Sequence, residues 1–426
     1  MRARSLSRPS CLRLFASVAF AALCLPSCEV RTLHRLGGES ISITTGDDEL
    51  RVWVSRKDYE LAVKCDGAVT FLEDESDVAT LGPSATFELE EIVGGVERAY
   101  EVRARHSGEL LRTYTQDGEE QPFDDEAKRW LAGALPRMFR ESGFDAEARI
   151  GRLLARGGAG AVLDEIELVR GEHAKVEYVA GLVRTVDLDE AQFGRVVAAT
   201  QSFDSDYELR RALGAVFEHE TIDGARAGQL LGAAKRIESD YELAELLIDA
   251  AELAGADPTA AKAWEETATL LDSDYELRRT LEAGLAHDRG DVGSAARRLA
   301  LAAERIDSDY ELGTVLKSVA KRGGAPELAT AYVAACRSLD SDYERRNALV
   351  ALLDAVALDR ERVAAVLAAT AEMDSDYEKQ LVLAATADRA AKDPELERAY
   401  REIARSLGDY ERGKALTALD DAMQGR

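Results

Sequence analysis

A tyrosine recurs through the second half of the chain at a nearly constant spacing. Successive gaps are 34, 34, 35, 33, 34 and 33 residues, between Tyr207, Tyr241, Tyr275, Tyr310, Tyr343, Tyr377 and Tyr410. A fixed period in this range is typical of solenoids and propellers, in which each repeat stacks on the next. The residues between the tyrosines show helical and not strand periodicity, which excludes a propeller and predicts an α-solenoid.

Each tyrosine lies in the same short phrase, Asp-Ser-Asp-Tyr-Glu with minor changes. A serine three residues before a glutamate is the pattern of a capping box. The serine oxygen accepts the backbone N–H of the glutamate, and the glutamate side chain accepts the N–H of the serine. The phrase therefore predicts the start of a helix in each repeat. The predicted helix-capping residues are Ser205, Glu208, Ser239, Glu242, Ser273, Glu276, Ser308, Glu311, Ser341, Glu344, Ser375 and Glu378.

A second helix start follows within each repeat. Asp257-Pro258 and Asp393-Pro394 place a capping residue before a proline at the first helical position, and Asp359 occupies the same place. Each repeat is therefore expected to contain two helices of about 14 residues. We expect regular repeats over 205–408, degenerate repeats over 141–204 with a turn at Gly157-Gly158, and a polar capping helix over 409–426.

The tyrosine of the phrase allows two interpretations. Apolar residues recur five, six and nine positions after it, and these cluster on the opposite side of the helix. The ordinary expectation is that the tyrosine packs against the adjacent repeat, with its hydroxyl bonded to backbone. The alternative is an exposed row that could grip an extended partner. The candidate partner-binding edge is Tyr207, Tyr241, Tyr275, Tyr310, Tyr343 and Tyr377.

The first part of the chain has the pattern of an export leader. Residues 1–27 combine a basic start with an apolar run that is too short to span a bilayer, which needs about 20 residues. The run ends in Leu25-Pro26-Ser27-Cys28, which resembles a bacterial lipobox, although a proline is unusual there. Cys28 is therefore the expected lipid attachment residue, and an ordinary secretion signal is the alternative. Both place the mature chain in the cell envelope or outside the cell.

A linker over 28–38 and a β domain over 39–123 are expected next. Short alternating stretches such as Leu50–Val54 and Tyr100–Arg103 are separated by turn signals such as Asp66-Gly67. This pattern predicts six to eight strands of an antiparallel sheet or sandwich with one solvated face. A connecting helix over 124–140 is expected to seal the sheet.

The composition and the absence of catalytic motifs argue against several classes of function. The chain has 54 basic and 80 acidic side chains and a net charge of -26, which argues against nucleic acid as a partner. It contains no P-loop, no Gly-x-Ser-x-Gly and no His-Glu-x-x-His, so we expect no enzyme and no cofactor. Cys65 and Cys336 are expected to be buried thiols.

Metal binding is weakly indicated. Histidines are isolated in the sequence, which disfavours a zinc site. Asp204, Asp206 and Glu208 resemble the first three ligands of an EF-hand loop, but Leu209 and Ala215 stand where that loop needs a glycine and an acidic residue. Calcium bridging between adjacent acidic edges stays an alternative to helix capping.

The repeats resemble those of bacterial Ser-Asp-Tyr-Glu repeat proteins. In these proteins the repeats follow a β-rich segment, and in some relatives they are appended to membrane metallopeptidases of the antirepressor class. The resemblance covers about residues 65–426 and includes the junction at Trp130–Ala132 and Ala155–Gly158. It implies the architecture but no catalysis, because the peptidase signature is absent here.

These observations predict an α+β protein, with a small antiparallel β domain followed by an α-solenoid similar to HEAT or tetratricopeptide arrays. The predicted function is that of an exported, lipid-anchored, non-enzymatic scaffold. It would bind an unidentified protein through its acidic solenoid and touch the membrane only through its lipid. Two alternatives stay open: an accessory sensor for an envelope peptidase or regulator, and a calcium-stabilised surface or adhesion protein.

Overall fold

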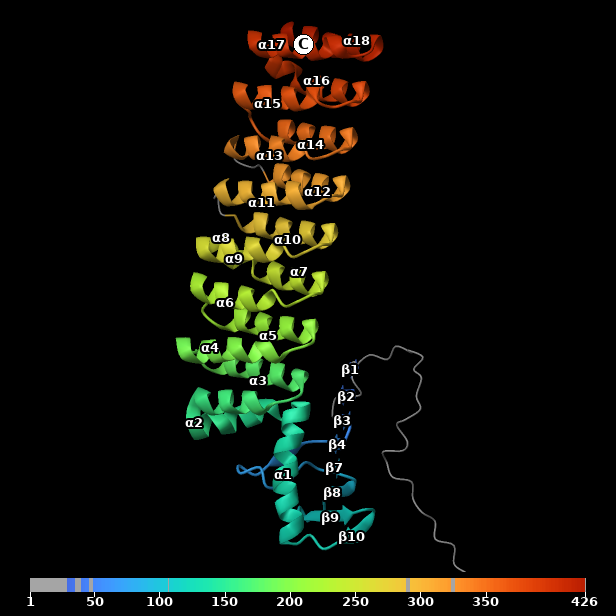
Figure 1. Cartoon of the computed structure of the whole chain (residues 1–426), viewed down its shortest axis with the longest axis vertical. Coiled ribbons are helices and arrows are strands. Elements are labelled where there is room, and N and C mark those ends of the chain that lie inside the picture. Colours follow the sequence, from blue (N-terminus) through green and yellow to red (C-terminus); the bar gives the residue numbers. More distant parts are fainter. Residues whose placement is uncertain are drawn as a thin grey trace, which may run out of the picture. The chain divides into compact units, whose positions relative to one another are not determined.

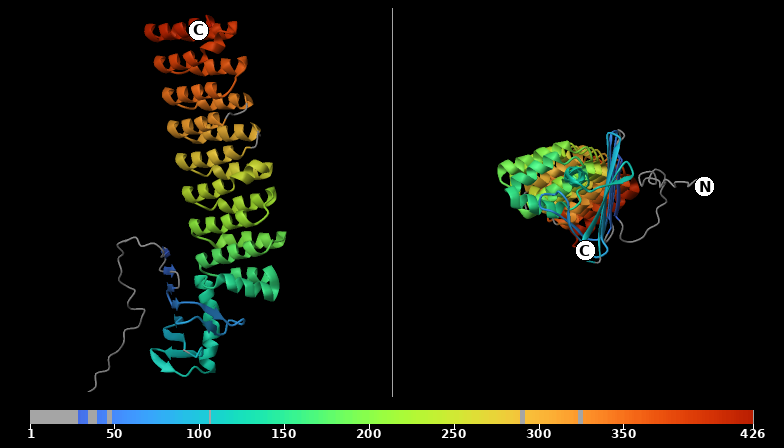
Figure 2. Two further views of the ribbon diagram at one scale, coloured as in Figure 1. Left: turned by 180° about the vertical axis from the view of Figure 1, so that it is seen from behind. Right: turned by 90° about the horizontal axis from the view of Figure 1, so that it is seen from below.

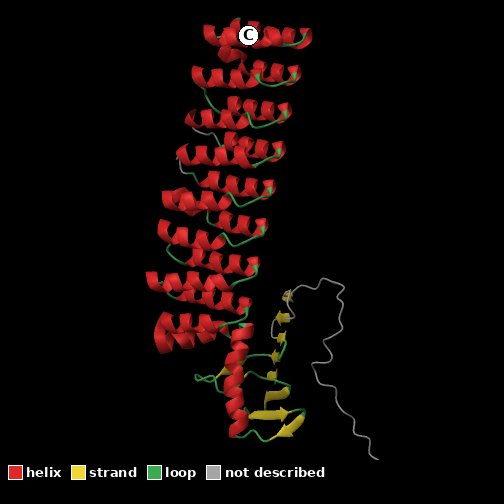
Figure 3. Ribbon diagram, viewed as in Figure 1, coloured by secondary structure: helices red, strands yellow, loops and turns green. Residues whose placement is uncertain are grey.

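The structure is a computed structural model that describes residues 29–34, 40–45, 49–105, 107–288, 292–322 and 326–425. The chain divides after Leu188 into two compact units, which are described separately. The first contains the sheet and three helices, and the second contains the helices that carry the tyrosine phrases. The predicted α+β class is confirmed, as is the order of a small antiparallel sheet followed by helical repeats (Figure 3).

The sheet of the first unit is antiparallel throughout, and its strand order is β1-β2-β3-β4-β7-β8-β9-β10. A separate two-stranded hairpin, β5-β6, lies in the connection between β4 and β7. The strands are β1 (Glu29–His34), β2 (Ser40–Thr45), β3 (Glu49–Arg56), β4 (Tyr59–Asp66), β5 (Val69–Phe71), β6 (Val78–Leu81), β7 (Thr86–Val93), β8 (Val96–Ala104), β9 (Leu110–Gln116) and β10 (Glu119–Gln121).

Two details of the predicted β domain are corrected. The described residues form ten strands, two more than the highest number expected. The linker expected over 28–38 contains the strand β1, which pairs in register with β2 and extends the sheet by one strand. Burial alternates along β4, where Leu61, Val63 and Cys65 face the core, and this matches the expectation of one covered and one solvated face.

Helix α1 (Asp125–Ser142) covers one face of this sheet. Leu131, Leu135 and Phe139 lie in the same core cluster as Phe87 and Val102 of the strands. The helix begins where Asp124 accepts the N–H groups of the first turn, and it ends at Gly143 in the left-handed conformation. The predicted connecting helix thus forms and seals the sheet.

The same unit contains α2 (Ala146–Leu168) and α3 (Glu172–Thr185), which pack against each other. The backbone of α2 leaves the helical conformation at Gly157 and Gly158, as the predicted turn requires. Gly158 has φ 65°, a value that glycine adopts without strain. The division of the chain after Leu188 lies inside the stretch expected to form degenerate repeats.

The second unit is a stack of helical pairs in chain order, and Figures 1 and 2 show it from opposite sides. One helix of each pair carries the phrase; these are α5 (Asp206–His219), α7 (Asp240–Asp249), α10 (Asp274–His287), α12 (Asp309–Lys321), α14 (Asp342–Ala355), α16 (Asp376–Ala390) and α18 (Asp409–Met423). The other helices are α4 (Glu190–Ala199), α6 (Gly224–Ala234), α8 (Ala251–Ala256), α9 (Pro258–Ala268), α11 (Val292–Arg305), α13 (Ala329–Cys336), α15 (Arg360–Ala371) and α17 (Pro394–Ser406), with 3-10 turns at Thr200–Ser202 and Pro326–Leu328.

The predicted apolar stripe forms the core of this stack. Leu246 and Leu247 of α7, and Val315 and Leu316 of α12, are fully buried. Helix α18 buries Ala415 and Leu419 and leaves charged side chains exposed, which matches the polar helix expected over 409–426.

Both cysteines of the described residues are buried free thiols, as predicted. Burial raises the pKa of Cys65 to about 11 and raises that of Cys336 further. Neither thiol is therefore placed to react while the chain is folded.

Candidate functional site

The tyrosines of the phrase are exposed at the first turn of their helices. Their exposed fractions range from 37% for Tyr207 to 67% for Tyr410. The expectation that these side chains pack against the adjacent repeat is therefore wrong, and the alternative of an exposed row holds. The row comprises Tyr207, Tyr241, Tyr275, Tyr310, Tyr343 and Tyr377, which we call the tyrosine edge; Tyr410 continues it.

The serines cap these helices as predicted. In each of six phrases the serine Oγ accepts the backbone N–H of the glutamate three residues later, at 3.3–3.4 Å. In the seventh phrase Gly408 replaces the serine, and α18 has no side-chain cap. The second helix of a repeat also begins where the sequence indicated, with Asp257, Asp359 and Asp393 as caps.

The second half of the predicted capping box is wrong for five of the six serines. The N–H groups of the capping serines Ser239, Ser273, Ser308, Ser341 and Ser375 bond to an aspartate of the preceding repeat, at 2.6–2.7 Å. That aspartate stands at the first position of the preceding helix, directly before its tyrosine. A charged carboxylate binds an N–H more strongly than a neutral acceptor does. Each phrase is thus tied to the next one, and consecutive tyrosines are held side by side.

The glutamates of the phrase bind basic side chains instead. Glu242 pairs with Arg210 at 2.6 Å, and Glu378 pairs with Arg346 at 2.7 Å, each across one repeat junction. Within α5, Glu208 pairs with Arg211 at 2.7 Å. The glutamates therefore contribute to the junctions between repeats.

Several of these basic side chains also lie over tyrosine rings. Arg278 lies 4.9 Å from the centroid of the Tyr275 ring, and Arg346 lies 4.8 Å from that of Tyr343. Arg210 lies 5.5 Å from the Tyr207 ring. These distances suit a cation–π interaction, which needs the charge within about 6 Å of the ring. The edge therefore has rings that already hold a cation of the same chain.

Two of the residues that resembled a calcium loop have partners within the protein, Asp206 in the next repeat and Glu208 in its own helix. Asp206 accepts the N–H groups of Glu238 and Ser239, and Glu208 is buried beside Arg211. Among the described residues, no group of three or more His, Cys, Asp or Glu side chains is placed to hold a metal. The carboxylates of the phrase thus serve helix ends and repeat contacts.

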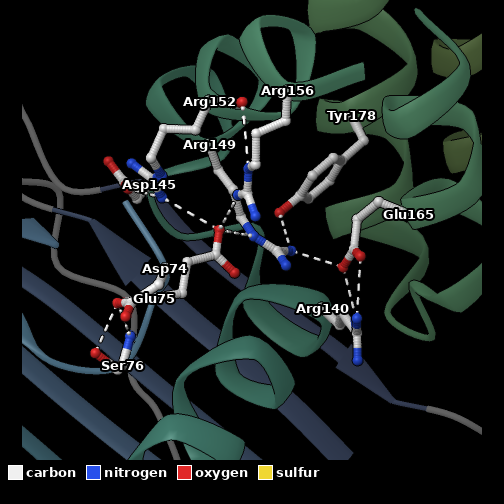
Figure 4. Close-up of polar contacts among 10 residues, drawn as sticks. All are labelled: Asp74, Glu75, Ser76, Arg140, Asp145, Arg149, Arg152, Arg156, Glu165 and Tyr178. Carbon is white, nitrogen blue, oxygen red and sulfur yellow. Dashed lines mark hydrogen bonds and ion pairs between the residues drawn. The ribbon is translucent and has the colours of Figure 1, made fainter. Parts of the chain in front are cut away.

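A second cluster of charges lies inside the first unit (Figure 4). Arg149 donates to Glu75 at 2.7 Å, to Glu165 at 2.7 Å and to the hydroxyl of Tyr178 at 2.8 Å, and Glu165 also accepts from Arg140. Burial opposes the charged form of Arg149, but these partners keep its pKa above the usual value. The cluster ties the turn between β5 and β6 to the three helices, which is a structural role.

One acidic residue on the sheet face opposite α1 has a raised pKa. Glu90 of β7 stands between Ala62 and Ala99 on the neighbouring strands. Burial, together with the charges of Glu97, Glu60 and Glu88, raises the pKa of Glu90 to about 7. This residue was not singled out from the sequence.

The structure does not test the expected leader and lipid attachment. Residues 1–28, which contain the expected leader and Cys28, lie outside the described residues. Among the described helices, none combines the length and apolar character needed to cross a bilayer. Comparison with protein-family models and with curated proteins gave no match.

Proposed function

We propose that the chain is an exported, lipid-anchored scaffold that binds another protein through the tyrosine edge and catalyses no reaction. One observation carries this proposal: six tyrosines recur at the same place in six repeats and are all exposed. Tyrosine is enriched at protein interfaces, because its ring supplies contact area and its hydroxyl tolerates water. A row of such rings on a rigid stack suits an extended partner.

The anchor is proposed from the leader. The basic start, the short apolar run and Cys28 support export and lipid attachment. The solenoid would then face the space outside the cytoplasm. The strongly acidic composition supports a protein partner over nucleic acid.

Site-specific photocrosslinking tests the proposal. A benzoylphenylalanine replaces Tyr241 or Tyr343 of the full chain in the cells that produce it, because this residue resembles tyrosine in shape. The matched control carries the same group at Lys262 of α9, whose side chain is 80% exposed and lies outside the tyrosine edge. The expected result is one crosslinked protein shared by Tyr241 and Tyr343 and missing at Lys262.

A competition experiment completes the test. A chain in which all six tyrosines of the edge are changed to serine should no longer compete with the crosslinked partner. Crosslinks that are equal at all three positions, or a six-serine chain that still competes, would refute a binding role of the edge.

A further inference from the structure

The tyrosine edge alternates between two kinds of site. Three and four residues after Tyr207, Tyr275, Tyr343 and Tyr410 stand one or two basic residues, and one of them lies over each ring. The residues at the same positions after Tyr241, Tyr310 and Tyr377 carry no positive charge. They are Ala244 and Glu245, Gly313 and Thr314, and Gln380 and Leu381. The edge therefore has a period of two repeats.

The spacing of three or four residues explains the difference, because it places a side chain beside the ring on the helix surface. In the first kind of site the guanidinium of Arg210 or Arg346 lies between its tyrosine and the glutamate of the next repeat. At Tyr310 the nearest cation comes from Lys317, one turn further along. Its Nζ lies 5.9 Å from the ring centroid and is held by Glu344 at 3.0 Å.

The second kind of site offers an aromatic ring without a basic residue at the third or fourth following position. Among the described residues, no cation–π contact involves Tyr241 or Tyr377, although both rings are 55% exposed. Three residues before these rings stand the exposed carboxylates of Glu238 and Asp374. A ring face attracts an ammonium or guanidinium group, and acidic side chains of the chain favour the approach of a cation.

We propose that Tyr241, Tyr310 and Tyr377 bind basic side chains of an extended, cationic polypeptide segment. The proposal rests on the proposed function and names the chemistry of the partner. The chain itself supplies a cation from the third or fourth following position at alternate rings. At the other three rings the partner supplies it, next to Lys317 in the case of Tyr310. The net charge of -26 favours a cationic partner over an acidic or neutral one and speeds its approach.

The spacing of the sites sets the spacing of the basic residues. Adjacent packed helices lie about 8–10 Å apart, so two repeats separate these rings by about 20 Å. An extended segment rises about 3.3 Å per residue, which gives about six residues between basic side chains. A folded basic protein without such a segment would match this spacing less well.

Peptide binding to the full chain tests this inference. The probe is a fluorescein-labelled Gly/Ser peptide with three arginines six residues apart, measured by fluorescence anisotropy at low salt. Two other peptides serve as controls, one with three contiguous arginines and one with three glutamates. We expect the spaced arginine peptide to bind at least about threefold more tightly than the contiguous one, and the glutamate peptide not to bind.

Two matched triple variants separate the two kinds of site. Tyr241→Ala/Tyr310→Ala/Tyr377→Ala should weaken the spaced peptide about tenfold or more. Tyr207→Ala/Tyr275→Ala/Tyr343→Ala removes as many rings and should weaken it less than about twofold. Circular dichroism checks that both chains are folded. If the first variant is not folded, Glu238→Lys/Asp307→Lys/Asp374→Lys keeps all the rings and should weaken the same peptide by a similar factor.

The outcomes distinguish this inference from the proposed function. Equal losses in both triple variants would overturn the alternation, and the crosslinking result would then still support the edge as a binding surface. Loss of the crosslinked partner in the six-serine chain, without any arginine-peptide binding to the unaltered chain, would overturn the cationic partner alone. Tighter binding of the glutamate peptide would overturn it as well.

Discussion

The contact between repeats predicts that one aspartate contributes more to stability than the serine it supports. Asp342 of α14 accepts the N–H of Ser375 at 2.6 Å and that of Asp374 at 2.7 Å. Hydrogen bonds to a charged group contribute about 1.5–3 kcal/mol each. The Asp374 N–H is exposed, so water replaces most of its bond, whereas the Ser375 N–H is partly buried. Loss of the favourable charge at the start of α14 adds about 0.3–1 kcal/mol.

Asp342→Ala should therefore destabilise the junction of α14 and α16 by about 2–3 kcal/mol. Asp342→Asn keeps one acceptor and should cost about 1 kcal/mol. Ser375→Ala removes only the cap to Glu378, which spans 3.3 Å, and should also cost about 1 kcal/mol. Asp374→Ala removes the same charge from an exposed position and serves as the control, with an expected change within about 0.5 kcal/mol.

Hydrogen exchange followed by mass spectrometry is the direct assay, because stacked repeats open locally and do not unfold in one step. The peptides that cover α16 report the free energy of opening at this junction, and urea unfolding followed by circular dichroism gives the global effect. If Asp342→Ala accelerates exchange in α16 no more than Asp374→Ala does, the aspartate contact does not stabilise the stack.

Three further predictions concern single side chains. Glu75→Ala leaves the buried charge of Arg149 without one of its partners and should destabilise the first unit by about 3 kcal/mol in urea unfolding followed by tryptophan fluorescence. Glu90 has a folded-state pKa of about 7, above the usual 4.5, so the folded state binds more protons and stability should fall as the pH rises from about 4.5 to 7. Glu90→Gln should remove that dependence and raise stability at pH 8 by about 1 kcal/mol, after allowance for solvent screening. Tyr400→Phe removes the buried bond from the hydroxyl to the carbonyl of Ala415, and the loss of about 1 kcal/mol should appear as faster hydrogen exchange in α18.

The helical part of the fold was predictable because its signals are local and repeated. A serine cap, an Asp-Pro pair and a stripe of apolar residues each act within a few residues, and the period places them in every repeat. The strand β1 was not predicted. It extends the sheet by pairing with β2, and no local sequence pattern marks where the sheet ends. The strand β4 was not singled out, although its alternating Leu61, Val63 and Cys65 were a sufficient signal.

The candidate site was only partly predictable. The six tyrosines were identified, but their exposure depends on the packing between repeats, which the angular position on one helix does not determine. The acceptor for the serine N–H was misassigned, because the capping box considers only residues within one turn. The aspartate that accepts it lies 32 to 34 residues earlier in the sequence. The charge alternation was readable from the sequence at the third and fourth positions after each tyrosine.

The structural contacts of the phrase do not account for a tyrosine in every repeat. The serine caps the helix, the aspartate joins the next repeat, and the glutamate binds a basic side chain of the stack. Cation–π contacts with basic residues of the same chain give the ring a structural role at Tyr207, Tyr275 and Tyr343, but among the described residues no such contact involves Tyr241 or Tyr377. Because the aspartate contact holds consecutive helix starts together, it also holds the rings at a fixed spacing before a partner arrives. Such preorganisation lowers the entropy cost of binding, so Asp342→Ala should weaken the spaced arginine peptide even though it removes no ring.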